Sequence, residues 1–232
     1  MSAMAGSVVE LREASKSERV YAHLRRRIRE LALEPGAPLR KDEIARALTV
    51  SRAPVSEAIA RLADEGLVEV FPQHGSFVAP IRPADVREAL FVRTALETEA
   101  MRRLAPVAGP DLMTRLDANL AAQADALAGG DLARFYDLDE ALHALIFGAA
   151  QGPRPLKLLD AARAPLDRLR RLALPESGRP ESTLAEHRCL VDALRSGDGD
   201  LAGAAMRAHL AKAATTVERE LIKMEEAARG AA

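Results

Sequence analysis

The chain has 232 residues and a net charge of −1, with 48% hydrophobic residues, only 3% aromatic residues and no Trp. Its length exceeds the usual size of one domain, and abundant Ala, Leu and Arg favour helices over a β-sandwich or barrel. The single Cys189 excludes an internal disulfide and no apolar run reaches the ~18 residues of a membrane span, so we expect a cytoplasmic, mainly α protein with two domains.

The first domain is expected over residues 15–81, after a flexible N-terminus of residues 1–14 that has no periodic pattern. Ser17 to Leu33 has the apolar spacing of a helix, and Glu34-Pro35-Gly36 ends it. The expected buried face of this helix consists of Val20, Leu24, Ile28 and Leu31.

A helix-turn-helix is expected next. Lys41 to Leu48 has one apolar face and predicts a short helix, which Thr49-Val50 interrupts. Ser51 is placed to cap a second helix, Arg52 to Glu65, with its hydroxyl. Gly66 can take the left-handed conformation that ends this helix. Its expected buried stripe is Val55, Ala58, Ile59 and Leu62.

A short hairpin follows the second helix. Leu67 to Phe71 is rich enough in apolar and β-branched residues for a strand, Pro72 to Ser76 is typical of a turn, and Phe77 to Ala79 can pair back. The segment therefore predicts a winged helix-turn-helix, whose second helix enters the DNA major groove. At the wing tip, His74 and Gly75 are expected to approach the minor groove or a phosphate.

The charge of this segment agrees with DNA binding. From Arg12 to Arg61 there are twelve Lys or Arg and seven Asp or Glu, a local charge of +5 that suits contacts with phosphates. A solvated helix face is the alternative for Arg25 to Arg29, and a protein-binding adaptor is the alternative for the domain. The expected DNA-binding residues, with Ala60 as an alternative to Arg61, are Arg40, Lys41, Ser51, Arg52, Ser56, Arg61, His74 and Gly75.

The segment from Leu39 to Val78 resembles the N-terminal signature of the GntR superfamily of bacterial transcription regulators. It reads LRKDEIARALTVSRAPVSEAIARLADEGLVEVFPQHGSFV. The shared pattern includes V-S-R-x-P-V-x-E-A, G-L-V and a wing with G-S-F-V. Many relatives carry an arginine where this chain has Ser56, and some carry one where it has Asp42. Because these two possible guanidinium contacts are missing, the operator sequence does not transfer from the relatives.

The second domain, residues 82–232, has no strand signal and short connections, which predict an antiparallel all-α helix bundle. Pro165 is expected to kink or split the fourth helix. The expected helices are Ala84 to Leu104, Asp111 to Leu127, Asp131 to Ala150, Leu156 to Leu174, Glu181 to Arg195 and Asp200 to Glu226.

Four polar residues lie on the expected inward faces of this bundle. Asp139 and His143 are four residues apart on one apolar stripe, and His187 and His209 lie on the stripes of the last two helices. Three His and one Asp can surround a divalent transition metal, such as zinc or nickel. From spacing alone, a metal site and a set of hydrogen-bonded core histidines both stay open.

The same residues resemble the FCD ligand-binding domain of the FadR-like subgroup. The matching motifs are Asp139-Glu-Ala-Leu-His143, Glu186-His187 with Gly197-Asp198, and Met206-Arg-Ala-His209-Leu210. The resemblance implies a divalent metal held by Asp139, His143, His187 and His209, beneath a pocket for a small, carboxylate-bearing effector. Arg93 matches a position near that pocket, and an ion pair with Glu97 is its alternative role.

We therefore expect a homodimeric, ligand-responsive transcription repressor that binds operator DNA and is not an enzyme. The alternatives are a metal-dependent enzyme and a structural-zinc adaptor that carry a winged-helix head. A hydrolytic site needs a general base, and we find none. Glu140 and Glu186 are adjacent to ligands in sequence, but a neighbour at i+1 points about 100° away on a helix.

Overall fold

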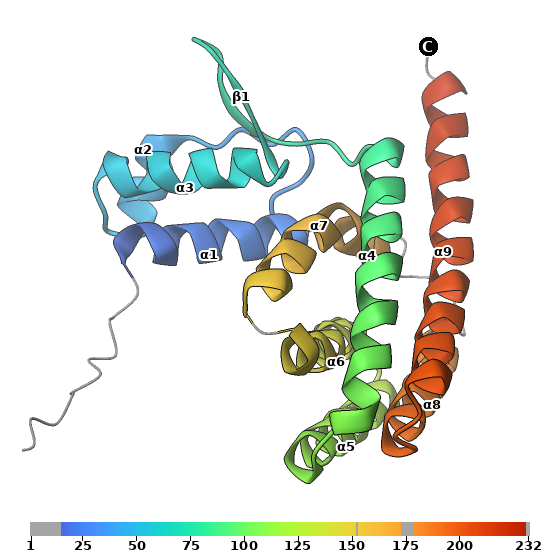
Figure 1. Cartoon of the computed structure of the whole chain (residues 1–232). Helices are drawn as coiled ribbons and strands as arrows, with labels where there is room; N and C mark the ends of the chain where they lie inside the picture. The colour runs from blue at the N-terminus through green and yellow to red at the C-terminus, as the bar shows by residue number, and fades with distance from the viewer. Residues whose placement is uncertain (1–14, 152, 173–178, 231–232) are drawn as a thin grey trace, which may run out of the picture. The chain divides into compact units, whose positions relative to one another are not determined.

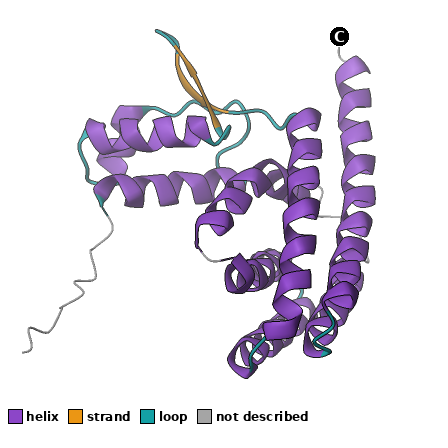
Figure 2. Cartoon of the chain, viewed as in Figure 1, coloured by secondary structure: helices purple, strands orange, loops and turns teal. Residues whose placement is uncertain are grey.

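A computed structural model describes residues 15–151, 153–172 and 179–230 (Figure 1). Within these ranges the chain forms nine α-helices, one short 3₁₀-helix and one two-stranded sheet, which confirms the mainly α fold (Figure 2). It divides into two compact units, Met1–Ala79 and Pro80–Ala232. The expected flexible N-terminus and the expected helix end at Leu174 lie outside the described residues.

The first unit opens with helix α1 (Lys16–Arg29), for which the side chain of Ser15 accepts a hydrogen bond from the backbone N–H of Glu18. The expected extension of this helix to Leu33 is wrong. Leu31 has a φ of +59°, which a right-handed helix does not allow, so the helix ends before it. The side chain of Leu31 is only half-buried. The other three residues of the expected stripe are buried.

Helices α2 (Lys41–Ala47) and α3 (Arg52–Asp64) form the expected helix-turn-helix. The predicted hydroxyl cap is wrong in one respect: Ser51 occupies the N-cap position, but its side chain makes no capping hydrogen bond. Gly66 has a φ of +70°, as expected of the residue that ends the second helix. The predicted buried stripe of α3 is also confirmed.

Strands β1 (Val68–Phe71) and β2 (Gly75–Val78) pair antiparallel and form the wing. The register places Val68 opposite Val78 and Phe71 opposite Gly75. The rings of Phe71 and Phe77 meet edge to face with centroids 6.0 Å apart, which stabilises the hairpin near its tip. The winged helix-turn-helix is thus confirmed as a fold.

The described part of the second unit contains seven helical segments and no strand, as predicted. They are α4 (Pro83–Leu104), the 3₁₀-helix η1 (Ala105–Val107), α5 (Pro110–Ala128), α6 (Leu132–Gln151), α7 (Pro153–Leu172), α8 (Arg179–Arg195) and α9 (Gly199–Gly230). Helix α7 is not split at Pro165, because a helix can continue where only one hydrogen bond is lost. None of the described helices carries an apolar stretch long enough to cross a membrane.

Helix α4 packs against α6, α7 and α9 and so forms the centre of this unit. Helices α4 and α9 lie side by side (Figure 1). At Gly199 a side chain is excluded, because a Cβ atom would lie 2.5 Å from the backbone oxygen of Arg102. The helical spacing of apolar residues in α4 and α9 would place Leu96 and Leu201 on the inward faces, but both are exposed, because the packed faces of the two helices are rotated away from them.

Candidate functional site

Three histidines from three helices meet in the interior of the helical unit. His143 of α6 and His187 of α8 are fully buried, and His209 of α9 is 4% exposed. Their ring centroids are 5.0 to 5.5 Å apart. One ligand nitrogen from each ring lies within 4.8 Å of the other two. The expected inward orientation of all three histidines is confirmed.

Each histidine has an oxygen partner at Nδ1 that comes from another helix. The distances are 2.5 Å from Oε2 of Glu97 to His143, 2.8 Å from Oε1 of Gln123 to His187, and 2.7 Å from Oε2 of Glu186 to His209. A hydrogen-bond acceptor at Nδ1, as at His187 and His209, favours the tautomer in which Nε2 carries the lone pair. This is the usual arrangement around histidines that bind metals.

The tautomer of His187 follows from a chain of hydrogen bonds that begins at a backbone carbonyl. The carbonyl oxygen of Leu138 can only accept, so Asn119 donates to it from Nδ2 at 3.1 Å. Oδ1 of Asn119 then accepts from Nε2 of Gln123 at 2.7 Å. This leaves Oε1 of Gln123 to accept from Nδ1–H of His187. In the neutral ring of His187, Nε2 therefore presents a lone pair.

Asp139 faces that lone pair. Its Oδ1 lies 3.2 Å from Nε2 of His187, and its Oδ2 accepts a hydrogen bond from Nη1 of Arg170 at 2.8 Å. Burial raises the pKa of Asp139, but the charge of Arg170 opposes this shift, and the pKa lies well below its usual value. Two buried acceptors at this distance repel each other unless a cation or a proton lies between them.

Burial favours the neutral rings of His143 and His209, the form that binds a metal. Burial lowers the pKa of His143 to about 3, although the nearby carboxylate of Glu97 opposes this shift. Burial also lowers the pKa of His209. Nε2 of His143 and Nε2 of His187 are buried and have no hydrogen-bond partner among the described residues. Unpaired imidazole nitrogens beside an ionised carboxylate are the donor set of a divalent transition metal, so these residues fit one.

Two buried arginines adjoin this cluster through Glu97. Nε of Arg93 lies 2.7 Å from Oε1 of Glu97, which confirms the ion pair expected on α4. Nη1 of Arg163 lies 3.9 Å from the same oxygen. Nη2 of Arg93 is buried without a hydrogen-bond partner in the described part of the chain. The ion pair therefore leaves one donor of Arg93 available, and the predicted effector contact stays a prediction.

The three Nδ1 partners were not predicted from the sequence. Gln123 lies on the buried stripe of α5, as does Asn119 one turn earlier, and this inward pair of polar residues was a readable signal. Glu186 does point away from its neighbour His187, as argued above. Its Oε2 lies 2.7 Å from Nδ1 of His209 on the adjacent helix, so Glu186 takes part in the site as a histidine partner, a role that the sequence did not predict.

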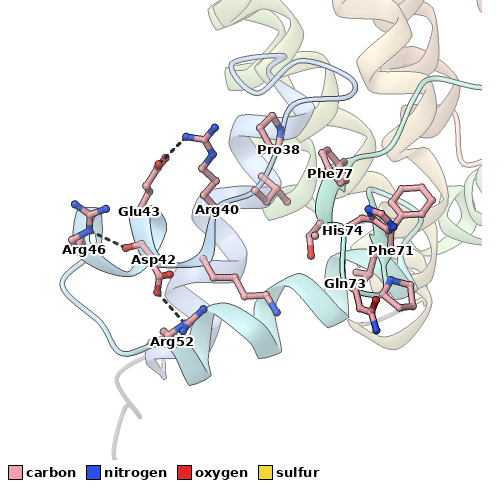
Figure 3. A pocket seen from close by; sticks show the side chains of 16 residues that line it. Pro38, Arg40, Asp42, Glu43, Arg46, Arg52, Phe71, Gln73, His74 and Phe77 are labelled. Carbon is pink, nitrogen blue, oxygen red and sulfur yellow. Dashed lines mark hydrogen bonds and ion pairs between the residues drawn. The ribbon is translucent and has the colours of Figure 1, made fainter.

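The second candidate site is a groove of about 830 Å³ in the winged unit, between the start of α2 and α3 and the wing (Figure 3). Five of the eight expected DNA-binding residues line it: Arg40, Lys41, Arg52, His74 and Gly75. Two of them are held by acids from α2. Arg40 lies 3.1 Å from Glu43, and Nε of Arg52 lies 2.9 Å from Oδ1 of Asp42.

The other three expected residues lie outside this groove. Ser51 is exposed and Ser56 is half-buried on α3. Arg61 has partners within the winged unit, and its expected contact with DNA stays a prediction. Its guanidinium carbon lies 3.5 Å from the centre of the Tyr21 ring, and its Nη1 lies 2.7 Å from Glu18, so Arg61 fastens α3 to α1.

Comparisons with known proteins agree with both units. Residues 16–78 match the family described as bacterial regulatory proteins, gntR family, and residues 88–212 match the FCD domain. The chain is 40% identical over 200 residues to an uncharacterized HTH-type transcriptional regulator in an unstable DNA locus of Streptomyces ambofaciens, covering 86% of this chain and 84% of that protein.

A second relative and a solved structure extend the comparison. The chain is 33% identical over 203 residues to the HTH-type transcriptional repressor RspR of Escherichia coli (strain K12), covering 88% of this chain and 89% of that protein. The structure of E. coli McbR/YncC superimposes with a TM-score of 0.80 over 90% of this chain and 99% of that chain. At 18% identity this last likeness concerns the fold alone.

Proposed function

The chain belongs to the gntR family of bacterial regulatory proteins and carries an FCD domain, and from this premise we propose that it is a ligand-responsive repressor of transcription. Residues 15–81 bind operator DNA, and residues 82–232 bind a divalent metal and a small effector and form a homodimer. The E. coli relative that carries the name repressor supports this direction of control. Because bacterial DNA lies in the cytoplasm, the proposed transcription regulator acts there.

The single observation that best supports a metal site is the short distance between His187 and Asp139. Their facing acceptors, Nε2 and Oδ1, are 3.2 Å apart in a fully buried site, and the hydrogen-bond chain through Gln123 assigns the lone pair to Nε2. A proton on Nε2 or a metal cation removes this repulsion, and we assign a metal because His143 and His209 bring further ligand nitrogens within 4.8 Å. The residues that would hold it are Asp139, His143, His187 and His209.

The DNA-binding function rests on the groove of the winged unit. Arg52 stands in the first turn of α3, the part of a recognition helix that meets base edges, and its side chain is exposed. Lys41, Arg40, His74 and Gly75 line the same groove and suit contacts with phosphates or the minor groove. Arg52 therefore specifies sequence in this proposal, and Lys41 strengthens binding to every sequence.

The effector is an organic acid that binds beside the metal. Four protein ligands leave open positions on a metal that prefers six, and a carboxylate with a neighbouring hydroxyl can fill them. Arg93 supports an anionic effector, because one of its buried donors has no partner among the described residues. A structural zinc held by all four residues is the second candidate for this site.

The test begins with metal analysis of the purified full-length protein, followed by chelation. Metal-loaded and metal-free samples are compared with a panel of organic acids, first for a shift in melting temperature and then for a change in operator affinity. We expect at least one acid to act only on the loaded protein, while chelation leaves basal operator binding intact. A structural metal would give a different result. Chelation would then lower the melting temperature, and neither the loaded nor the metal-free protein would respond to any acid.

A further inference from the structure

An acid stands at the DNA-facing end of the recognition helix. Asp42, in the first turn of α2, places Oδ1 2.9 Å from Nε of Arg52, the first residue of α3 (Figure 3). Both side chains are largely exposed, at 63% and 69%. A carboxylate on a surface that meets phosphates weakens binding through repulsion. Its presence beside Arg52 therefore needs a reason that compensates for this cost.

The geometry of the pair supplies a reason. A guanidinium has five N–H donors in a fixed fork, and a carboxylate at Nε occupies one side of that fork. The edge formed by Nη1 and Nη2 is the edge that reads O6 and N7 of guanine. Asp42 can therefore bind Arg52 at Nε while Nη1 and Nη2 of Arg52 stay available to contact guanine.

Asp42 is itself fixed in place. It belongs to the first turn of a helix, where the free backbone N–H groups favour a negative charge. Nε of Arg46, one turn further along α2, donates to the backbone oxygen of Asp42 at 3.3 Å. The carboxylate therefore projects from a defined position on α2 rather than from a loop.

We propose that Asp42 is a positioning residue for Arg52 and that it increases the discrimination of one guanine in the operator. This inference rests on the proposed base contact of Arg52. An exposed ion pair is weak in water, but it strengthens when DNA excludes water from the groove. Ordering the arginine before contact also removes part of the entropy that binding would otherwise cost.

The experiment compares full-length wild-type protein with Asp42→Asn, Glu43→Gln and Arg52→Ala. Glu43→Gln is the matched control, because Glu43 lies on the same turn of α2 and its partner is Arg40 instead of Arg52. The probe is an operator selected by the wild-type protein from random-sequence DNA. Each variant is measured against this operator, against copies with one base pair replaced, and against unrelated DNA.

Both neutral variants remove one negative charge, so both should bind unrelated DNA somewhat more tightly. Only Asp42→Asn should also lose discrimination, by about three- to tenfold, and only at the guanine where Arg52→Ala loses it. A double variant, Asp42→Asn with Arg52→Ala, should discriminate no worse than Arg52→Ala alone.

The outcomes separate this inference from the proposed function. If Arg52→Ala loses discrimination and Asp42→Asn behaves like Glu43→Gln, Asp42 only repels phosphates and the inference is overturned while the base contact stands. If Arg52→Ala keeps full discrimination at every base pair, the base contact and the inference both fail.

Discussion

Oε1 of Gln123 lies 2.8 Å from Nδ1 of His187, and both groups are buried. The donor and acceptor roles of this pair are fixed from outside, because Asn119 links Gln123 to the backbone oxygen of Leu138. In the sequence pattern, Gln123 is only a polar residue on an apolar stripe. In the structure, it determines which nitrogen of His187 is free for the proposed metal.

Replacing Gln123 with Leu should weaken metal binding about 10- to 100-fold, the usual cost of losing an outer partner of a histidine ligand. The replacement removes the acceptor that keeps the proton on Nδ1 of His187. Metal titration of the metal-free protein by calorimetry gives the affinity, and nitrogen NMR of the histidine rings reports the tautomer. Gln123→Glu loses the donor to Oδ1 of Asn119 but retains an acceptor for Nδ1–H, so it should keep the tautomer of His187. Equal affinities in all three proteins would rule out this role for Gln123.

Replacing His187 or His209 with Ala should remove the metal from the purified protein. Each substitution deletes one of three imidazoles whose ligand nitrogens lie within 4.8 Å of one another. Elemental analysis by mass spectrometry gives the metal content per chain. His74→Ala, in the winged unit, is the control and should keep the wild-type content. A His187→Ala protein with a full complement of metal would contradict the proposed ligand set.

Replacing Arg93 with Ala should lower the free energy of unfolding of the helical unit by about 3 to 5 kcal/mol. The reason is that Glu97 would stay buried at 2% exposure without the guanidinium 2.7 Å away. Urea unfolding followed by circular dichroism measures the change. Arg102→Ala, which breaks an exposed pair with Glu99 on the same helix, should have little effect. A similarly small change for Arg93→Ala would mean that water or another group reaches Glu97.

Arg52→Ala and Lys41→Ala should change DNA binding in different ways. Loss of Arg52 should cost about 1 to 3 kcal/mol on the selected operator. Loss of Lys41 should weaken all sequences alike and reduce the slope of log affinity against log salt by about one unit. Fluorescence anisotropy at several salt concentrations separates the two. Unchanged operator affinity in Arg52→Ala would contradict the assignment of α3 as the recognition helix.

The protein should be a homodimer in solution, because one winged unit reaches only one half of a palindromic operator. Light scattering at micromolar concentration should give about twice the chain mass of 24.9 kDa. A mass near that of one chain, both with and without operator DNA, would refute this prediction.

The sequence alone determined the features that depend on local periodicity. Apolar spacing and Gly66 gave α2, α3 and the wing, because a helix face and a left-handed turn leave a pattern within a few residues. The same periodicity placed His143, His187 and His209 on inward faces, and all three are buried. Local pattern was less reliable at helix ends, as Leu31 shows, since tertiary contacts decide where a helix stops.

Only the tertiary structure decided which polar groups meet. Gln123 and His187 are 64 residues apart, and Arg61 and Glu18 are 43 residues apart, so no periodic pattern connects them. The rotation of each helix about its axis set these partners, and it turned Arg61 toward Tyr21 and Glu186 toward His209. A helical pattern fixes the face on which a side chain lies, but the neighbour it meets depends on how two such faces pack.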